Sequence, residues 1–228
     1  MVVVVRGREP ERRRRAAGSA RSPRREVGLV YDVCLMVIPA LLLLGAFLLG
    51  SIPTGVLVAR GKGVDLRKVG SGNIGATNVG RALGKKWAAF VLIVDAGKGA
   101  LPVLLFDHYQ FDPWLPAFGG LAAIIGQAFS IFLRGRGGKG VATSLGAGLA
   151  LAPLPTLLCL LTFVITYALS RIVSLGSLVA IAGFPLFLWL FHLGTAPRLT
   201  FAVLVAVLVI VRHKDNLKRL ARGEEHRA

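Results

Sequence analysis

Three short segments of the chain combine small or polar residues with fixed positive charge, a combination that suits phosphate binding. The first, Val69–Arg81, reads VGSGNIGATNVGR. A turn of small residues exposes backbone N–H groups that can surround an anion, and Arg81 adds a permanent charge. The side chains that add hydrogen-bonding groups are Ser71, Asn73, Thr77 and Asn78. A flexible linker, or close helix packing through small residues, is the alternative for this segment taken alone.

The same segment contains a G-x-G-x-x-G string at Gly70, Gly72 and Gly75, with Asp95 further along the chain. A dinucleotide site would need a strand before this string and a helix after it, within a βαβ unit. Here a basic loop precedes the string, and Asp95 lies in an apolar run. We therefore exclude the dinucleotide interpretation and keep the anion-binding one.

The second segment, Arg134–Thr143, reads RGRGGKGVAT. Lys139 is followed by Gly140 rather than by Ser or Thr, so the segment is not a Walker A loop. A glycine-rich loop that carries Lys and Arg and opens a helix still suits a phosphate, because backbone amides at a helix N-terminus favour negative charge. An ordinary basic loop on the inner side of a membrane is the alternative.

The third segment, Arg212–Asn216, reads RHKDN. On a helix, both Arg212 and His213 share a face with Asn216. His213 could donate a hydrogen bond to an anion or act as a base, whereas the simpler interpretation is a basic cluster at the membrane edge. A further polar pair, Ser174 and Ser177, follows Arg171.

Long apolar runs must position these segments. The chain has 228 residues, 54% of them hydrophobic, and a mean hydropathy of +0.67. A run of about 20 apolar residues is long enough to cross a bilayer. The clearest runs are Val33–Ala59, Pro113–Leu133, Val173–Leu193 and Leu199–Val211. We expect an all-α, polytopic membrane protein with no separate soluble domain.

Charges between the runs predict the orientation, since Lys and Arg favour the cytoplasmic side. The glycine-rich loop Arg60–Lys86 is basic and is placed inside, whereas Asp107–Trp114 has no Lys or Arg and is placed outside. Continuing this alternation gives seven spans and an inner C-terminus. Two segments, 141–152 and 155–170, are short or interrupted by proline, so five spans are the lower bound.

The formal net charge of +17 would suggest a nucleic-acid partner in a soluble protein. Here the basic residues lie beside the apolar runs, so we attribute most of them to membrane orientation, with anion or lipid-headgroup binding as a second role. No basic face interleaved with aromatic residues indicates nucleic acid. Cys34 and Cys159 lie in apolar runs and indicate neither a disulfide nor a metal site.

Residues 1–30 contain nine arginines before any long apolar run, and we expect a disordered basic extension. Its charge opposes the outer N-terminus that the seven-span scheme requires. Either later charges dominate, or the natural start lies near Val30 or Met36 and the extension is an artefact. The remaining chain divides into a membrane domain, residues 31–222, and a short tail, residues 223–228. Asp95 and Lys98, inside an apolar run, predict an internal ion pair or support for a site.

Together the motifs resemble those of the bacterial membrane glycerol-3-phosphate acyltransferases that use acyl phosphate as donor, from about Leu49 to Gly223. Six strings carry this resemblance in order: Gly50–Gly55, Gly70–Asn78 with Arg81, Asp95–Gly99, Gly137–Thr143, Arg171–Ser177 and Arg212–Asn216. The chain departs from the family pattern at Gln127 and Ser130, where the family usually has His and Pro, and at Arg134–Arg136. These departures bear on the shape of the loop before Lys139.

The resemblance implies seven spans around a site that faces the cytoplasm of a bacterial inner membrane. It implies five catalytic residues: Ser71, Arg81, Lys139, His213 and Asn216. It implies that the substrates' phosphates are bound by Gly72, Asn73, Thr77, Asn78, Gly137, Gly138, Gly140, Ser174 and Ser177. It implies no cofactor and no metal.

The reaction that the resemblance implies moves an acyl chain from acyl phosphate to the sn-1 hydroxyl of glycerol 3-phosphate, the first step of phospholipid biosynthesis. An enzyme that makes acyl phosphate would act upstream. The chain lacks an H-x-x-x-x-D pair, which acyltransferases using acyl-CoA or acyl carrier protein usually have. His213 is one candidate base, and proton uptake by the leaving phosphate is the other, which the resemblance favours. An anion transporter and a membrane scaffold are the alternative functions.

Overall fold

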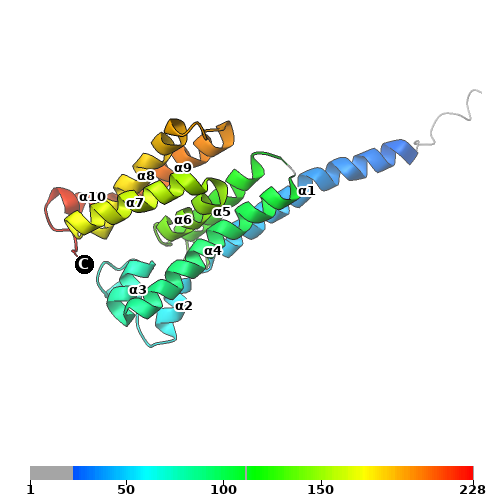
Figure 1. Ribbon diagram of the computed structural model, residues 1–228. Coiled ribbons are helices and arrows are strands. Elements are labelled where there is room, and N and C mark those ends of the chain that lie inside the picture. Colours follow the sequence, from blue (N-terminus) through cyan, green and yellow to red (C-terminus); the bar gives the residue numbers. More distant parts are fainter. Residues whose placement is uncertain (1–22, 111, 228) are drawn as a thin grey trace, which may run out of the picture. The chain divides into compact units, whose positions relative to one another are not determined.

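The computed structural model describes residues 23–110 and 112–227, and every regular element within these ranges is a helix (Figure 1). Residues 1–22 of the expected N-terminal extension therefore lie outside the described residues. The chain divides into two compact units, Met1–Ile38 and Pro39–Ala228. All contacts given below lie within Pro39–Ala228.

The helices follow one another with short connections. In chain order they are α1 (Pro23–Ser51), α2 (Thr54–Arg60), η2 (Leu66–Lys68), α3 (Ala76–Leu83), α4 (Lys85–Tyr109), α5 (Leu115–Ala128), η3 (Ile131–Leu133), α6 (Val141–Leu151), α7 (Pro153–Ser170), α8 (Val173–Leu190), α9 (Ala196–Arg212) and α10 (Lys214–Ala221). The expectation of an all-α membrane protein is confirmed.

Five segments are long and apolar enough to cross a membrane: Val37–Arg60, Lys85–Tyr109, Leu115–Leu133, Pro153–Ser170 and Val173–Leu190. A sixth results if α9 and α10, which meet at an angle of 61°, are counted as one broken span. The remaining apolar helix, α6, has 11 residues. At 1.5 Å per residue it covers about 16 Å of a hydrocarbon core about 30 Å thick. The described residues thus meet the lower bound of five spans, and the count of seven is not confirmed.

Proline interrupts the first apolar run. The sequence predicted an apolar run over Val33–Ala59 long enough to cross a bilayer, and within that run α1 ends at Ser51 and α2 begins at Thr54. Pro53 lies in this break and has no backbone N–H to continue the helical hydrogen bonds. The break leaves non-helical backbone at Ile52 and Pro53.

Glycines bring pairs of helices into direct backbone contact. A methyl group on Gly146 in α6 would overlap the carbonyl oxygen of Ala96 in α4, and one on Gly99 in α4 would overlap that of Thr143 in α6. The same relation holds where Gly50 and Gly126 join α1 and α5. Small residues of this kind allow close packing where the surrounding lipid provides no hydrophobic driving force.

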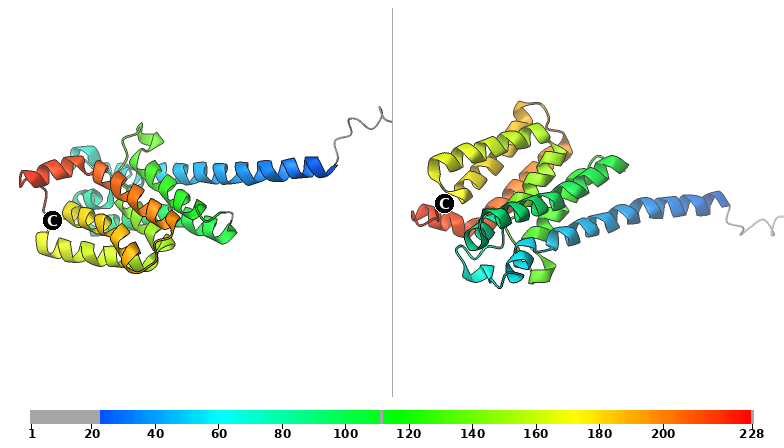
Figure 2. Two further views of the ribbon diagram at one scale, coloured as in Figure 1. Left: turned by 90° about the horizontal axis from the view of Figure 1, so that it is seen from above. Right: turned by 60° about the horizontal axis from the view of Figure 1, so that its bottom comes forward.

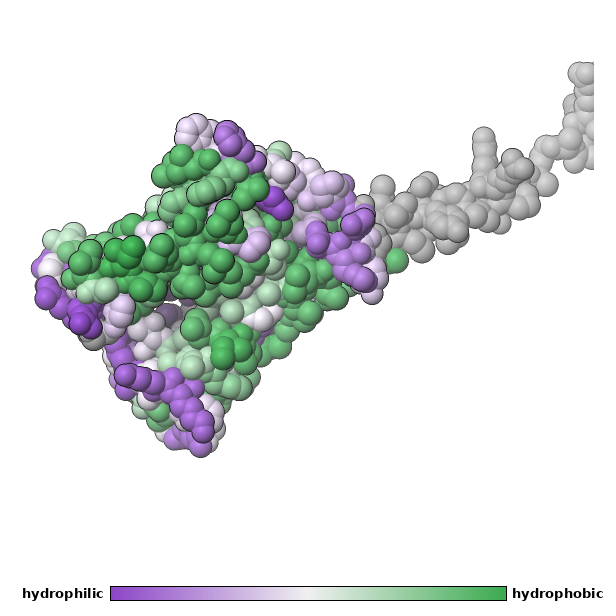
Figure 3. All heavy atoms as spheres, viewed as in Figure 1, coloured by the Kyte–Doolittle hydropathy of each residue, from purple (hydrophilic) through white to green (hydrophobic). Residues whose placement is uncertain are grey.

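The core of the helical bundle fills the space between α4, α5, α6, α8 and α9. Val103, Ile124, Leu188 and Phe201 are almost completely buried there. By contrast, α7 exposes much of its apolar surface, including Leu169 at 83% exposure. Figure 3 shows these apolar residues spread over α7 and α8, with hydrophilic residues at the ends of the bundle. This distribution fits a protein surrounded by lipid.

Figures 1 and 2 show α2, α3 and α10 at the same end of the bundle. The connection between α4 and α5 lies at the opposite end. The first glycine-rich segment runs into α3, and the second runs into α6. The motifs identified in the sequence therefore gather at the end that contains α10. The fold thus brings the motif-bearing loops to one side of the membrane region.

The contact between α4 and α6 can be tested with two matched glycine substitutions. We expect Gly146→Ala to destabilise the protein by about 1–3 kcal/mol, because the added methyl group overlaps the Ala96 backbone. Gly97→Ala is the control, since Gly97 also lies in a helix but has open space around it. Unfolding midpoints in detergent, followed by circular dichroism, measure both. Equal loss of stability in the two variants would contradict the close-packing interpretation.

Candidate functional site

Asn78 shapes the first glycine-rich loop from within. Its side chain is 1% exposed, and its amide donates to the carbonyl oxygens of Leu66 and Val69, both at 3.0 Å. Its side-chain oxygen accepts the backbone N–H of Ser71 at 3.2 Å. The sequence predicted Asn78 as a phosphate-binding residue, and the structure commits both ends of its amide to the loop backbone.

The other predicted residues of this loop are more accessible. Ser71, Gly72 and Asn73 are partly buried, whereas Thr77 and Arg81 are exposed. Thr77 and Arg81 lie four residues apart in α3 and so share one face of that helix. A hydroxyl and a guanidinium are therefore presented together beside the loop that Asn78 holds.

The second glycine-rich loop packs against the end of α5. The N–H of Gly138 donates to the carbonyl of Gln127 at 2.8 Å. A Cβ on Gly137 would overlap that same carbonyl, so the close approach requires glycine. Gly140 has φ of +78° and immediately precedes α6, a backbone conformation that residues with a side chain rarely adopt. The loop and the start of α6 therefore depend on these glycines.

Arg212 also binds the second loop, through the backbone carbonyls of two of its glycines. Its Nε donates to the carbonyl oxygen of Gly138 and its Nη2 to that of Gly137, each at 3.1 Å. The guanidinium also lies over the ring of Phe129, 5.2 Å from the ring centre. Because one planar group engages two consecutive carbonyls, the orientation of the peptide units before Lys139 is defined.

Lys139 reaches the third motif. Its Nζ donates to the Asn216 side-chain oxygen at 2.5 Å, which joins residues 77 positions apart. The Asn216 amide donates to Glu225 at 2.6 Å. Since a carboxylate can only accept hydrogen bonds, Glu225 defines which end of the Asn216 side chain faces Lys139.

Glu225 connects three parts of the site. One of its oxygens also accepts from Ser174 at 3.0 Å, and the other accepts from Arg219 at 2.8 Å. Burial alone would raise the pKa of Glu225, but the hydrogen bonds from Asn216, Arg219 and Ser174 outweigh it and hold the pKa below its ordinary value. The carboxyl group is therefore ionised at neutral pH.

Lys139 carries a weakened positive charge. Burial, the largest cause, lowers the pKa of Lys139 from 10.5 to about 8 because a desolvated ammonium is disfavoured. The nearby Glu225 and Asp215 oppose this shift, whereas Arg219 and Arg81 add to it. The influence of Arg81 shows that the first loop's cation acts at the second loop.

Two further contacts join the first two loops. Arg67 donates to the carbonyl oxygen of Arg136 at 2.7 Å. A Cβ on Gly138 would lie 3.6 Å from the side chain of Ile74. The segments that the sequence singled out separately are therefore parts of one site, together with Asn216 and Ser174.

His213 lies at the bend between α9 and α10 and is 2% exposed. Its Nδ1 is 2.7 Å from the carbonyl oxygen of Val209. A carbonyl only accepts, so the hydrogen belongs on Nδ1, and the neutral ring keeps Nε2 as an acceptor.

Ser177 differs from Ser174, because its hydroxyl donates to the carbonyl oxygen of Val173 within α8 at 2.9 Å.

Sequence reasoning missed Glu225 and Arg219 as members of this site. Both lie in the charged C-terminal region, where the sequence pattern does not distinguish a charge in a site from a charge in solvent. The departures Gln127 and Ser130 are both buried, and each makes a hydrogen bond to another helix: Gln127 to Asp95 at 3.1 Å, and Ser130 to the Ser51 carbonyl at 2.5 Å.

Comparison with known proteins identifies the family. A family model described as glycerol-3-phosphate acyltransferase matches residues 40–223. The chain belongs to the glycerol-3-phosphate acyltransferase family. The relative from Geotalea daltonii is 46% identical over 185 residues, which cover 81% of this chain and 95% of that protein. The relative from Aquifex aeolicus is 44% identical over 188 residues, 82% and 97% of the two chains. The resemblance drawn from the sequence motifs is confirmed at the level of the family.

Solved structures agree with this assignment to the glycerol-3-phosphate acyltransferase family. The glycerol 3-phosphate form of PlsY, an integral membrane glycerol 3-phosphate acyltransferase, is 42% identical, with a TM-score of 0.81 over 83% of this chain and 95% of that chain. The lysophosphatidic acid form is 40% identical with a TM-score of 0.78. With its five long apolar helices, this family member is a multi-pass membrane protein.

The role of Asn78 as an internal support of the first loop can be tested by stability. We expect Asn78→Ala to destabilise the protein by about 2–4 kcal/mol, since three hydrogen bonds of a buried side chain, at about 1 kcal/mol each, are lost. Asn73→Ala is the control, because the described residues offer the Asn73 side chain no hydrogen-bond partner. Chemical unfolding in detergent measures both, and a similar loss in the control would refute the assignment.

Proposed function

We propose that this chain transfers an acyl chain from an acyl phosphate to the sn-1 hydroxyl of glycerol 3-phosphate, forming lysophosphatidic acid and phosphate. The observation that carries this proposal is the hydrogen bond between Lys139 and Asn216. It joins a glycine-rich, phosphate-type loop to the third motif, within reach of the Arg81 charge. The names of the family and of the PlsY structures support the acceptor and the product.

The substrates suit a site rich in cations and backbone amides. An acyl phosphate is a mixed anhydride and is already activated, so the site must chiefly align two phosphates and stabilise the developing oxyanion. We assign Arg81, Ser71 and Thr77 to phosphate binding, with the Lys139 loop. Gly137 and Gly140 would contribute backbone amides, whereas Gly138, whose N–H donates to Gln127, would shape the loop.

The chemical step balances without a protein nucleophile. The sn-1 hydroxyl oxygen forms a bond to the acyl carbon, and the bond from that carbon to the phosphate oxygen breaks. The hydroxyl proton passes to the leaving phosphate, which is the route we favour. We assign His213 and Asn216 to positioning glycerol 3-phosphate. With the hydrogen on Nδ1, the Nε2 of His213 would be the alternative acceptor for the proton.

Donor choice follows from the same chemistry. The chain has no H-x-x-x-x-D pair, so it lacks the acid–base arrangement usual in acyltransferases that use acyl thioesters. A better leaving group, phosphate, removes much of the need for such a pair. We infer that an enzyme that produces acyl phosphate acts before this one, and that the site faces the cytoplasm from the bacterial inner membrane. The basic loops at the site's end of the bundle support that orientation.

The proposal predicts the donor and the effect of removing the loop cation. Purified protein should convert labelled glycerol 3-phosphate to lysophosphatidic acid with palmitoyl phosphate but not with palmitoyl-CoA. Lys139→Ala should lower kcat/KM by about 10²–10³-fold, because a charged hydrogen-bond donor in the site is lost. Product formed only from palmitoyl-CoA would overturn the donor. Absence of product from either donor, with the protein folded, would sink the acyltransferase proposal.

The lowered pKa of Lys139 predicts an alkaline limb in the pH profile. Lys139 is charged below about pH 8 and loses its proton as the pH rises, so kcat/KM for acyl phosphate should fall above that pH. Rates would be corrected for uncatalysed hydrolysis of the donor. In Lys139→Arg the guanidinium stays charged, so the limb should disappear even if the absolute rate drops. An unchanged limb in this variant would show that another group causes it.

A further inference from the structure

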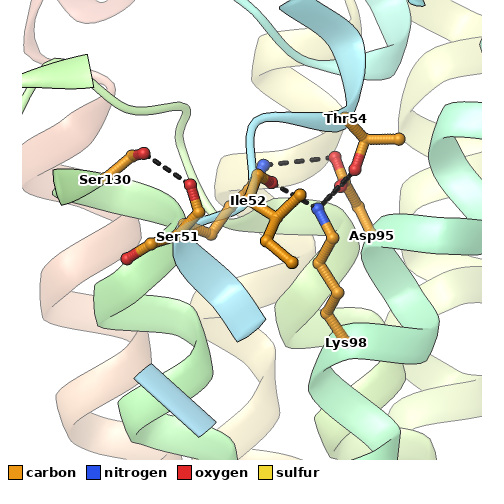
Figure 4. Close-up of polar contacts among 7 residues, drawn as sticks. Ser51, Ile52, Thr54, Asp95, Lys98 and Ser130 are labelled. Carbon is orange, nitrogen blue, oxygen red and sulfur yellow. Dashed lines mark hydrogen bonds and ion pairs between the residues drawn. The ribbon is translucent and has the colours of Figure 1, made fainter. Parts of the chain in front are cut away.

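A buried ion pair lies apart from the proposed catalytic residues. Asp95 and Lys98, both in α4, are 2% and 5% exposed, and their charged atoms are 2.7 Å apart. Lys98 also donates to the carbonyl oxygen of Ile52 at 2.6 Å and to the hydroxyl of Thr54. The pair thus binds the backbone at the break between α1 and α2, as Figure 4 shows. Charges placed this deeply among apolar helices require such partners.

Each oxygen of Asp95 has a different set of partners. Oδ1 accepts from Lys98 and from Thr54, the latter at 2.8 Å. Oδ2 accepts from the side-chain amide of Gln127 at 3.1 Å, and the described residues provide no other donor to it. Gln127 is 5% exposed and lies at the second-last position of α5. Its side chain therefore ties the end of α5 to the ion pair in α4.

The backbone of Gln127 contacts the second glycine-rich loop. The last carbonyls of a helix have no partner within the helix. The Gln127 carbonyl accepts the N–H of Gly138 at 2.8 Å. Gly138 immediately precedes Lys139, which donates to Asn216. One residue thus links the buried carboxylate to the loop that presents the ammonium.

Ser130 provides a second anchor for the same segment. Its hydroxyl donates to the carbonyl oxygen of Ser51, the last residue of α1, at 2.5 Å (Figure 4). Its own carbonyl accepts the N–H groups of Leu133 and Gly135. The chain between α5 and the Lys139 loop is therefore held at both Gln127 and Ser130, against two different helices.

We infer that Gln127 and Ser130 are positioning residues, which fix the Lys139 loop relative to the buried Asp95–Lys98 pair. This inference rests on the proposed function, since it assigns the loop a catalytic task. Neither residue is assigned a contact with substrate. They act through the Gly138 amide and through the path of residues 131–138.

Kinetics of single and double variants test the inference. Gln127→Leu keeps a similar volume but removes the donor to Asp95. We expect it to lower kcat/KM for acyl phosphate roughly tenfold to a hundredfold, as a displaced loop would. Because the effect passes through Lys139, Gln127→Leu should cause little further loss in a Lys139→Ala background. Fully additive losses would overturn the inference and leave a general stability role.

Conservative and control variants sharpen the comparison. Gln127→His retains a ring N–H that can reach Asp95 and should recover most of the activity lost in Gln127→Leu. Ser130→Ala should show a weaker loss of the same kind. Thr162→Val is the matched control, since its hydroxyl donates only to Leu158 within α7 and is remote from the loop in sequence. Its kcat/KM should equal that of the unmodified protein, and an equal loss there would argue against specific positioning.

Hydrogen exchange supplies a readout that does not depend on activity. In Gln127→Leu, peptides covering 131–140 should exchange faster, whereas peptides covering 70–81 should not change. Unchanged exchange at 131–140 would overturn the inference. If the unmodified protein forms no product from either donor, the proposed function fails, and the exchange data still decide whether Gln127 holds the loop.

Discussion

Non-helical backbone beside a lipid bilayer must find hydrogen-bond partners within the protein, and the site depends on this constraint. Asn78 donates hydrogen bonds to backbone carbonyls at the first glycine-rich loop, and Arg212 donates to carbonyls of the second. Each uses a planar side chain to engage two carbonyls. Four carbonyls, those of Leu66, Val69, Gly137 and Gly138, are thereby occupied. The amides of Ser71 and Gly138 are also bonded within the protein, so the cations and the remaining loop amides are the groups that can meet an anion. The same hydrogen bonds from Asn78 and Arg212 therefore fix the shape of the loops and remove carbonyl oxygens that would repel an anion.

Charge balance at the site combines excess cations with one buried carboxylate. Arg219 and Arg81 add to the effect of burial in lowering the pKa of Lys139. Glu225 offsets part of that repulsion and at the same time orients Asn216 and Ser174. Without an opposing charge, the desolvated ammonium of Lys139 would be unfavourable in the folded state. The arrangement thus reconciles a stable fold with affinity for phosphate.

Much of the fold could be predicted from the sequence, because apolar run length reports directly on membrane helices. The loop motifs and their resemblance predicted the family correctly. The break at Pro53 was missed inside a continuous apolar run, and α6 was too short for its span to be settled by length. The bond between Lys139 and Asn216 spans 77 positions, and Glu225 lies in a charged tail, so neither contact follows from local pattern. Tertiary packing alone brings them together.

The shortness of α6 has a consequence for how the protein is made. A helix of 11 residues cannot cross the hydrocarbon core, and only Ala152 separates it from α7. Since α7 is long enough to cross by itself, α6 is the helix whose insertion depends on its neighbours. The close contacts of Gly146 in α6 with Ala96, and of Gly99 in α4 with Thr143, further require that α4 already be in place when α6 packs. The order of helix synthesis along the chain, with α4 before α6, matches that requirement.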